Sequence, residues 1–289
     1  MRVGILQSLT GTMAISEVPL RDAALMAIAE INAAGGVLGQ PIEPIVADGA
    51  SDPPTFAAQA QRLIQSDGVA TLFGCWTSAS RKAVLPIIEA LNCLLWYPVQ
   101  YEGLESSPNI FYTGSCLNQQ VEPAVHWLLQ QQYRRVYLLG SDYLFPHTAN
   151  RMIGALLKAE GGAVVGEDYI ALGRNTFGEA IAHILQTQPD VVFSTLNGDS
   201  NVAFYQQYQQ AGITAAQIPI MAVSVAEAEL QQIGVAAVGH YAAWSYFQSL
   251  STPANQQFVQ RFSTAMEPIA SPVTRLKPPT SRFICGSRL

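Results

Sequence analysis

The chain has 289 residues, of which 49% are hydrophobic and 12% are charged, and its formal net charge is −6. This much apolar material exceeds what a single core usually holds, so two domains of ordinary size are expected. The acidic balance and the lack of a Lys/Arg cluster argue against nucleic acid as a partner. No apolar run reaches the about 20 residues needed to span a bilayer.

In the first part of the chain, short apolar runs alternate with helical patterns. RVGILQS precedes PLRDAALMAIAEINAAGG, IEPIVAD precedes PPTFAAQAQRLIQSDG, ATLFGC precedes SASRKAVLPIIEALN, and CLLWYPV follows. We expect Pro19 to stand before the first helix and Gly35-Gly36 to end it. Near-continuous apolar strands alternating with helices predict a parallel sheet that is covered on both faces.

After NIFYTGS the alternation starts again and continues to GHYAAWSYF. The fold class is therefore α/β, with two doubly wound parallel-sheet lobes joined by a hinge. Lobe 1 is expected over residues 1–116 and lobe 2 over 117–247, and a helix at 248–266 returns to lobe 1. The crossings are predicted around Thr113 to Leu117 and around Tyr246 to Thr252, and short crossings of this kind form hinges.

Ligands of open parallel sheets bind beyond the carboxyl ends of the strands, so the residues after each strand are the candidate site. Hydroxyls, aromatics and amides dominate these positions, which include Ser8 to Gly11, Trp76 to Ser80, Tyr97 to Tyr101 and Ser141 to Phe145. A phosphate cradle needs glycine patterns that GCWTSASRK lacks. A nucleophile elbow would need Gly-x-Ser-x-Gly, which is also missing, so an amide hydrolase is the weaker alternative and no catalytic residue is assigned.

The four cysteines have no Cys-x-x-Cys spacing and no histidine-rich companion segment, so the sequence predicts neither a metal site nor a disulfide framework, and no cofactor. The remaining interpretation of the strand ends is a ligand clamp. Ser78 or Ser80 at a helix start is either a plain N-cap or directs its hydroxyl at a ligand, together with backbone N–H groups. Trp76 belongs either to the wall of a pocket or to the core.

The segments GCWTSASRKAVLP, LLWYPVQYEG, SPNIFYTG, GSDYLFPHTAN, DVVFSTLNGDSNVAFY and GHYAAWSYFQS resemble the urea and short-chain amide branch of the type I periplasmic binding proteins. The resemblance runs from about Arg2 to Met266, with the motifs in the expected order. It implies two lobes that trap a solute between them and deliver it to the membrane subunits of an ABC permease. Cytosolic amide sensors share this fold and remain the alternative.

The resemblance also implies site residues. The pocket of the amide sensors uses a serine, two tyrosines and a threonine, followed by a last tyrosine. The serine corresponds to Ser78, and the first two tyrosines correspond to Tyr97 and Tyr143. The position of the threonine is occupied by Val99, and that of the last tyrosine by Phe145. Because Val99 and Phe145 depart from the sensors, urea transport is favoured over acetamide sensing. The carboxylates or amides of Asn197, Asp199 and Glu227 are the candidates for the NH₂ groups of a small neutral solute, although each could equally be a helix cap.

The resemblance implies a periplasmic location, whereas the sequence begins directly with a strand pattern and shows no export signal, so a cytosolic location stays open. The end, RLKPPTSRFICGSRL, departs from the family. Residues Arg275 to Leu289 can be encoded by a nucleotide sequence that, read in the frame two nucleotides later, encodes the family pattern Pro-Glu-Ala-Ala-Tyr. We therefore expect a frameshifted gene and a C-terminally truncated product, with residues 267–289 an aberrant, disordered tail and with poor solubility or impaired binding.

Overall fold

The structure is a computed structural model that describes residues 1–266 and 282–285. It divides into two compact units. Unit 1 contains Met1–Val99, Leu104–Gly114 and the stretch that begins at Gln248; unit 2 contains Gln100–Gly103, Ser115–Phe247 and the last described strand. The division between the units after Gly114 and after Phe247 falls within the two expected crossings. The short excursion Gln100–Gly103 into unit 2 was not predicted from the sequence.

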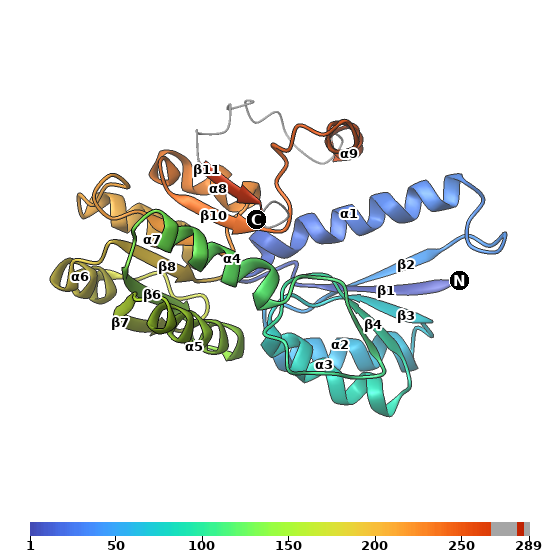
Figure 1. Cartoon of the computed structure of the whole chain (residues 1–289). Helices are drawn as coiled ribbons and strands as arrows, with labels where there is room; N and C mark the ends of the chain where they lie inside the picture. Colours follow the sequence, from blue (N-terminus) through green and yellow to red (C-terminus); the bar gives the residue numbers. More distant parts are fainter. Residues whose placement is uncertain (267–281, 286–289) are drawn as a thin grey trace. The chain divides into compact units, whose positions relative to one another are not determined.

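Unit 1 is built on a five-stranded sheet in the order β2-β1-β3-β4-β5, and every pairing in it is parallel. Helix α1 lies on one face of this sheet, and α2 and α3 lie on the other (Figure 1). The elements are β1 (Arg2–Gln7), α1 (Ala14–Ala33), β2 (Glu43–Asp48), α2 (Pro53–Gln65), β3 (Thr71–Gly74), α3 (Ser78–Ala90), β4 (Leu94–Tyr97), β5 (Ile110–Tyr112) and α9 (Pro253–Met266).

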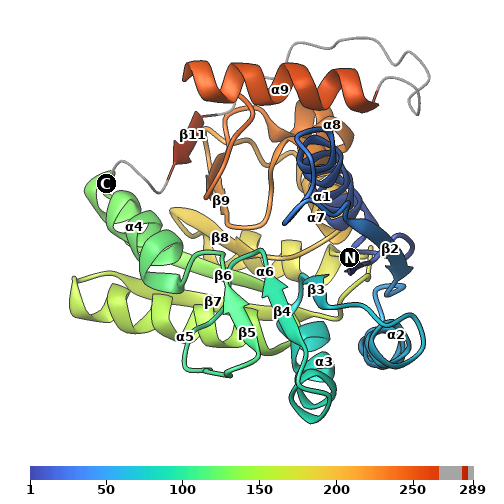
Figure 2. The same ribbon diagram turned by 90° about the vertical axis from the view of Figure 1, so that its right-hand side faces the viewer.

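The two faces of the unit 1 sheet follow from alternating side chains. On the α2 side, a Cβ at Gly4 would lie 2.5 Å from Leu72 of the neighbouring strand and 3.2 Å from Leu63 of α2, so glycine lets these layers close together. On the other face, Phe73, Trp96 and Phe111 form a stacked row across β3, β4 and β5, with ring centroids 5.9 Å and 4.3 Å apart. Figure 2 shows β4 and β5 side by side.

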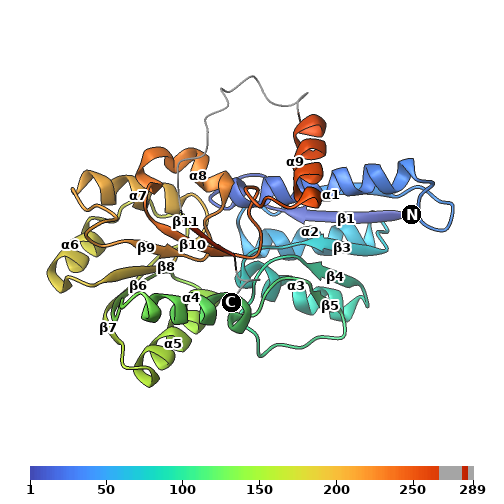
Figure 3. The ribbon, with the colours of Figure 1, turned by 45° about the horizontal axis from the view of Figure 1, so that its top comes forward.

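Unit 2 is built on a six-stranded parallel sheet in the order β11-β10-β9-β8-β6-β7. Helices α4 and α5 cover one face, and α6, α7 and α8 cover the other (Figure 3). The elements are α4 (Leu117–Gln130), β6 (Arg135–Ser141), α5 (Leu144–Ala159), β7 (Ala163–Ile170), α6 (Gly178–Thr187), β8 (Val191–Thr195), α7 (Ser200–Gln210), β9 (Ile220–Ala222), α8 (Glu227–Ile233), a 3₁₀ turn (Gly234–Ala237), β10 (Tyr241–Trp244) and β11 (Arg282–Cys285).

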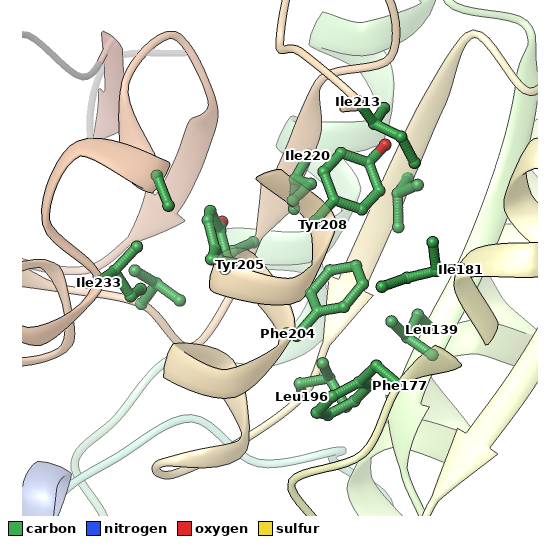
Figure 4. Packing of buried hydrophobic residues seen from close by; sticks show 14 of the residues in the cluster. Leu139, Phe177, Ile181, Leu196, Phe204, Tyr205, Tyr208, Ile213, Ile220 and Ile233 are labelled. Carbon is green, nitrogen blue, oxygen red and sulfur yellow. The ribbon is translucent and has the colours of Figure 1, made fainter. Parts of the chain in front are cut away.

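The central strands β6, β8 and β9 of unit 2 are buried on both faces and are largely apolar on both. Leu139 and Val192 point toward α6 and α7, where they meet an aromatic cluster that includes Phe177, Phe204 and Tyr208 (Figure 4). The intervening strand residues pack against α4 and α5 on the opposite face. The α/β class with two parallel sheets, expected from the alternation of patterns, is therefore confirmed.

Two helix starts differ from the sequence expectation. Helix α1 begins at Ala14, so Pro19 lies inside it and not before it. The helix can begin early because Ala14 N–H donates to the Gly11 carbonyl, and the Met13 carbonyl accepts from Glu17 N–H, which completes the first turn. At α3 the N-cap is Thr77, whose hydroxyl oxygen accepts from Ser80 N–H at 3.0 Å, and not Ser78 or Ser80.

Within the described ranges, no helix is long and apolar enough to cross a membrane. Of the stretch for which disorder is predicted, the structure describes Arg282–Cys285, as a strand paired with β10. Residues 267–281 and 286–289 lie outside the described residues, so the prediction for them stays untested.

Candidate functional site

The carboxyl end of β1 in unit 1 carries a buried acid. Ser8 follows β1, and its N–H donates to Glu17 Oε2 at 2.6 Å. Glu17 is 1% exposed, and its Oε1 is buried without a hydrogen-bond partner. Burial raises the pKa of the Glu17 carboxyl to about 8, against the opposing effect of the hydrogen bonds from Ser8. This side chain therefore holds a proton at neutral pH.

The carboxyl end of β2 is organised by Asp48. Its carboxylate accepts from Leu9 N–H at 2.8 Å, from the Thr10 hydroxyl at 2.7 Å and from Ala50 N–H at 2.7 Å. Desolvation would raise the pKa of Asp48, but these hydrogen bonds outweigh it and hold the pKa below its usual value. Asp48 thus fixes the loops that follow β1 and β2.

The turn from β3 into α3 has positive backbone φ angles, which glycine adopts more readily than other residues. Gly74 has φ 155°, and a Cβ there would lie 1.8 Å from the Leu6 carbonyl oxygen. Cys75 follows with φ 63°. The turn brings Ser78 to the first position of α3, where the helix N-terminus favours an electron-rich ligand atom. Ser78 is 1% exposed in the structure.

Behind Ser78 lies a fully buried arginine. Arg81 Nη1 donates to Ser78 Oγ at 3.2 Å, and Arg81 Nε donates to Glu105 Oε1 at 2.6 Å. The guanidinium carbon lies 4.9 Å from the centroid of the Tyr97 ring. Burial would raise the pKa of Glu105, but the hydrogen bonds from Lys82 and Arg81 and the charge of Arg81 keep it below its usual value. The acid is therefore a carboxylate that compensates Arg81.

The structure brings together three of the predicted site residues of unit 1, which are Trp76, Ser78 and Tyr97. Tyr97, at the end of β4, is completely buried, and its hydroxyl donates to the Trp76 carbonyl. Arg81 connects Tyr97 to Ser78. Val99 is buried two residues beyond Tyr97, where a Cβ at Gly114 would lie only 1.9 Å from the Val99 carbonyl oxygen. The polar tip of Tyr97 is thus directed to backbone inside the unit.

In unit 2 the ends of neighbouring strands are connected by polar side chains. Asn197, after β8, is fully buried; its N–H donates to the Ser141 hydroxyl at the end of β6, and its Nδ2 donates to the Thr195 carbonyl. Asn201 Nδ2 reaches the carbonyls of Leu196 and Ser224. The Ser141 hydroxyl therefore connects the ends of β6 and β8, and the Asn201 side chain connects the ends of β8 and β9.

The other predicted residues of unit 2 start helices. Tyr143 is half-buried at the N-cap of α5, and Phe145 packs in the core between α4 and the sheet. Asp199 is exposed at the N-cap of α7, where its side chain makes no capping hydrogen bond. Glu227 is half-buried at the first position of α8. These residues follow β6, β8 and β9, which are neighbours in the sheet.

Several polar residues at the strand ends were missed by sequence reasoning. Glu17 lies in a helical pattern, and Glu105 lies in a loop far from Arg81 in sequence, so no local motif marks them. The same holds for Gln100, which donates to the Ser224 hydroxyl, and for Gln120, which donates to the carbonyls of Val223 and Ala243. The serine-to-arginine spacing at Ser78 and Arg81 was the one available signal, because residues three apart share a helix face.

An open pocket of about 540 Å³ lies elsewhere on unit 2 and is lined by Tyr137, Asp168, His183 and neighbours on β7 and α6. These are residues of strand interiors and of a covering helix. The pocket therefore does not belong to the strand-end constellation, and it contains none of the predicted site residues.

The fold is similar to that of solved solute-binding proteins. A solute binding protein of an ABC transporter from Rhodopseudomonas palustris, in complex with 3,4-dihydroxybenzoic acid, is 22% identical with a TM-score of 0.83, over 92% of this chain and 74% of that one. An ABC transporter substrate-binding protein from Sphaerobacter thermophilus is 26% identical with a TM-score of 0.76, over 93% and 75% of the two chains.

Two relatives of known name are called binding proteins for leucine, isoleucine and valine. A Leu/Ile/Val-binding protein homolog of Brucella melitensis is 25% identical over 75% of this chain, and the chain spans 57% of that relative. The Leu/Ile/Val-binding protein BraC3 of Rhizobium johnstonii is 26% identical over 66% of this chain and 53% of its own length.

The family model of the periplasmic binding protein domain matches residues 1–278, which is nearly the whole chain. The match covers the sheet of unit 1, strands β6 to β10 of unit 2 and the strand-end residues of each unit. The relatives and structures described above are named as binding proteins. The chain therefore belongs to the periplasmic binding protein domain family.

Proposed function

We propose that this chain is the solute-binding component of an ABC-type uptake system, that it acts in the periplasm and passes its solute to permease subunits, and that it does not turn the solute over. The support is membership of the periplasmic binding protein family and likeness to substrate-binding proteins of ABC transporters. The strand-end residues give this proposal a site, since ligands of open parallel sheets bind at that edge.

The proposed solute is a small neutral carbonyl compound, either urea or a short-chain amide. The observation that carries this choice is the position of Ser78, which lies on the first turn of α3 beside a buried arginine paired with a carboxylate. Helix N–H groups and a hydroxyl favour a carbonyl oxygen. Because the Arg81 charge is already compensated, a full negative charge on the solute has no dedicated partner among these groups.

The second candidate solute is a branched-chain amino acid, which the names of the Brucella and Rhizobium relatives favour. Such a ligand carries both a carboxylate and an ammonium group, and it buries a larger apolar side chain than urea does. A cytosolic amide sensor would share the urea or amide solute and differ in location, so cell fractionation separates it from the transport protein.

Titration calorimetry with urea, acetamide, leucine and benzoate tests the solute class. We expect heat and saturable binding with urea or acetamide, and no ammonia release on prolonged incubation with urea. Binding of leucine alone would establish the amino-acid candidate and contradict the amide proposal. Ammonia production would instead show that the protein is an enzyme.

A further inference from the structure

The ion pair behind Ser78 is an unusual feature of unit 1. The Arg81 side chain is 0% exposed and the Glu105 side chain is 7% exposed, and their Nε and Oε1 atoms are 2.6 Å apart. The Tyr112 hydroxyl donates to the same carboxylate oxygen at 2.9 Å. Such a pair is costly to desolvate, and apolar residues of similar volume would stabilise a fold as well. The pair therefore calls for a role other than stability.

The position of the pair indicates that role. Besides pairing with Glu105, Arg81 donates to Ser78 Oγ, the hydroxyl oxygen of the first residue of α3. A ligand atom bound at this helix start would lie within a few ångströms of the guanidinium. The charge that such an atom experiences depends on whether Glu105 compensates Arg81. The same position without a carboxylate would be strongly positive and would favour anions.

We propose that Glu105 is a specificity-determining residue: by compensating Arg81 behind Ser78, it makes this end of the site prefer a neutral carbonyl group to a carboxylate of the same shape. The inference rests on the proposed function and deepens it, because it separates amides from acids. Among the described residues, Lys82 is the other charged group paired with Glu105, but its side chain is 45% exposed, so water screens its charge. The buried guanidinium is screened far less.

Acetamide and acetate provide the test, because they have nearly the same shape and differ by one charge. For the wild-type chain, we expect calorimetry to give tighter binding of acetamide. Glu105→Gln keeps the size of the side chain and leaves Arg81 uncompensated. The ratio of the two dissociation constants should then move toward acetate by at least about tenfold, as expected for a full charge at this range in a partly buried site.

Glu89→Gln is the matched control. Glu89 lies on the same helix and contacts the same loop, since it accepts from the Ser107 hydroxyl at 2.7 Å, and its substitution changes the net charge equally. Its acetamide-to-acetate ratio should stay at the wild-type value. An equal shift in both variants would show a general charge effect and overturn the inference.

A second variant keeps the inference testable if Glu105→Gln does not fold. Arg81→Gln leaves the Glu105 carboxylate and removes the guanidinium, so the ratio should move further away from acetate. No change of the ratio in a folded Glu105→Gln variant, or a move toward acetate in Arg81→Gln, would overturn the inference. If the wild-type chain binds neither acetamide nor urea, the proposed function itself has failed, which is a distinguishable result.

Discussion

Ser78 is the residue on which the proposed binding chemistry depends most directly. It is buried at the first position of α3, and its oxygen accepts a hydrogen bond from Arg81. Ser78→Ala should weaken urea and acetamide binding by roughly one to two decades, because a buried polar group that loses its partner costs about 1–3 kcal/mol. Calorimetry checks this, with circular dichroism to show that the fold is kept. Unchanged affinities would remove Ser78 from the site.

Val99 provides the test of selectivity at residue scale. It is buried just beyond β4, where the amide sensors that the sequence resembles have a threonine. Val99→Thr places a hydroxyl near Tyr97 without adding volume. We expect the preference between urea and acetamide to change while the fold is retained. Equal changes for both solutes would mean that Val99 contributes packing and not discrimination.

Glu17 makes stability depend on pH. Its folded pKa of about 8 lies above the value of 4.5 for a free carboxyl, so the folded state keeps a proton that the unfolded state releases. The contribution of this group to the free energy of unfolding should be largest below pH 4.5. Between pH 4.5 and 8 it should fall, with a slope approaching about 1.4 kcal/mol per pH unit. Above pH 8 this contribution levels off.

Glu17→Gln should remove that slope, because glutamine fills the same space and does not ionise. Unfolding by guanidinium chloride at several pH values measures this, and urea should be avoided because it is a proposed ligand. Glu43→Gln is the control, since Glu43 is exposed and pairs only with exposed Arg2 among the described ion pairs. Parallel pH profiles for wild type and Glu17→Gln would contradict the burial argument.

At the scale of elements, the turn between β3 and α3 determines whether the site forms. A side chain at Gly74 would collide with the Leu6 carbonyl oxygen on the adjacent strand, at 1.8 Å from the added Cβ. Gly74→Ala should therefore lower the free energy of unfolding by more than about 2 kcal/mol. In the same variant, solute binding should weaken, because the turn positions Ser78.

Gly178→Ala is the comparison for that substitution. Gly178 begins α6 in unit 2, and a Cβ there meets no atom within 4 Å. Its stability should change by no more than about 0.5 kcal/mol. Guanidinium chloride unfolding of both variants checks the prediction. A Gly74→Ala protein as stable as Gly178→Ala would show that the strand and the turn can move apart at little cost.

At the scale of the whole molecule, the chain contains two doubly wound units, and its family match extends from residue 1 to residue 278. Within the described residues, each unit is completed by a segment from a distant part of the sequence. The stretch with α9 belongs to unit 1, where Arg261 donates to Glu30 of α1 at 2.9 Å. The excursion Gln100–Gly103 belongs to unit 2, and Gln100 donates to Ser224 there. We expected the helix at 248–266 to return to lobe 1, whereas no local pattern predicts the excursion.

The sequence by itself determined the fold class, because the period of apolar residues and the order of strands and helices depend on local chemistry. It also determined which strand ends carry hydroxyls and aromatics, and so named Ser78, Tyr97 and Asn197. Only the tertiary structure decided what those side chains do. Tyr97 donates to backbone, Phe145 packs in the core, and the partners Glu17, Arg81 and Glu105 become visible. The physical reason is that hydrogen bonds and charge compensation join residues that are distant in sequence, and burial, which no local pattern records, sets their strength.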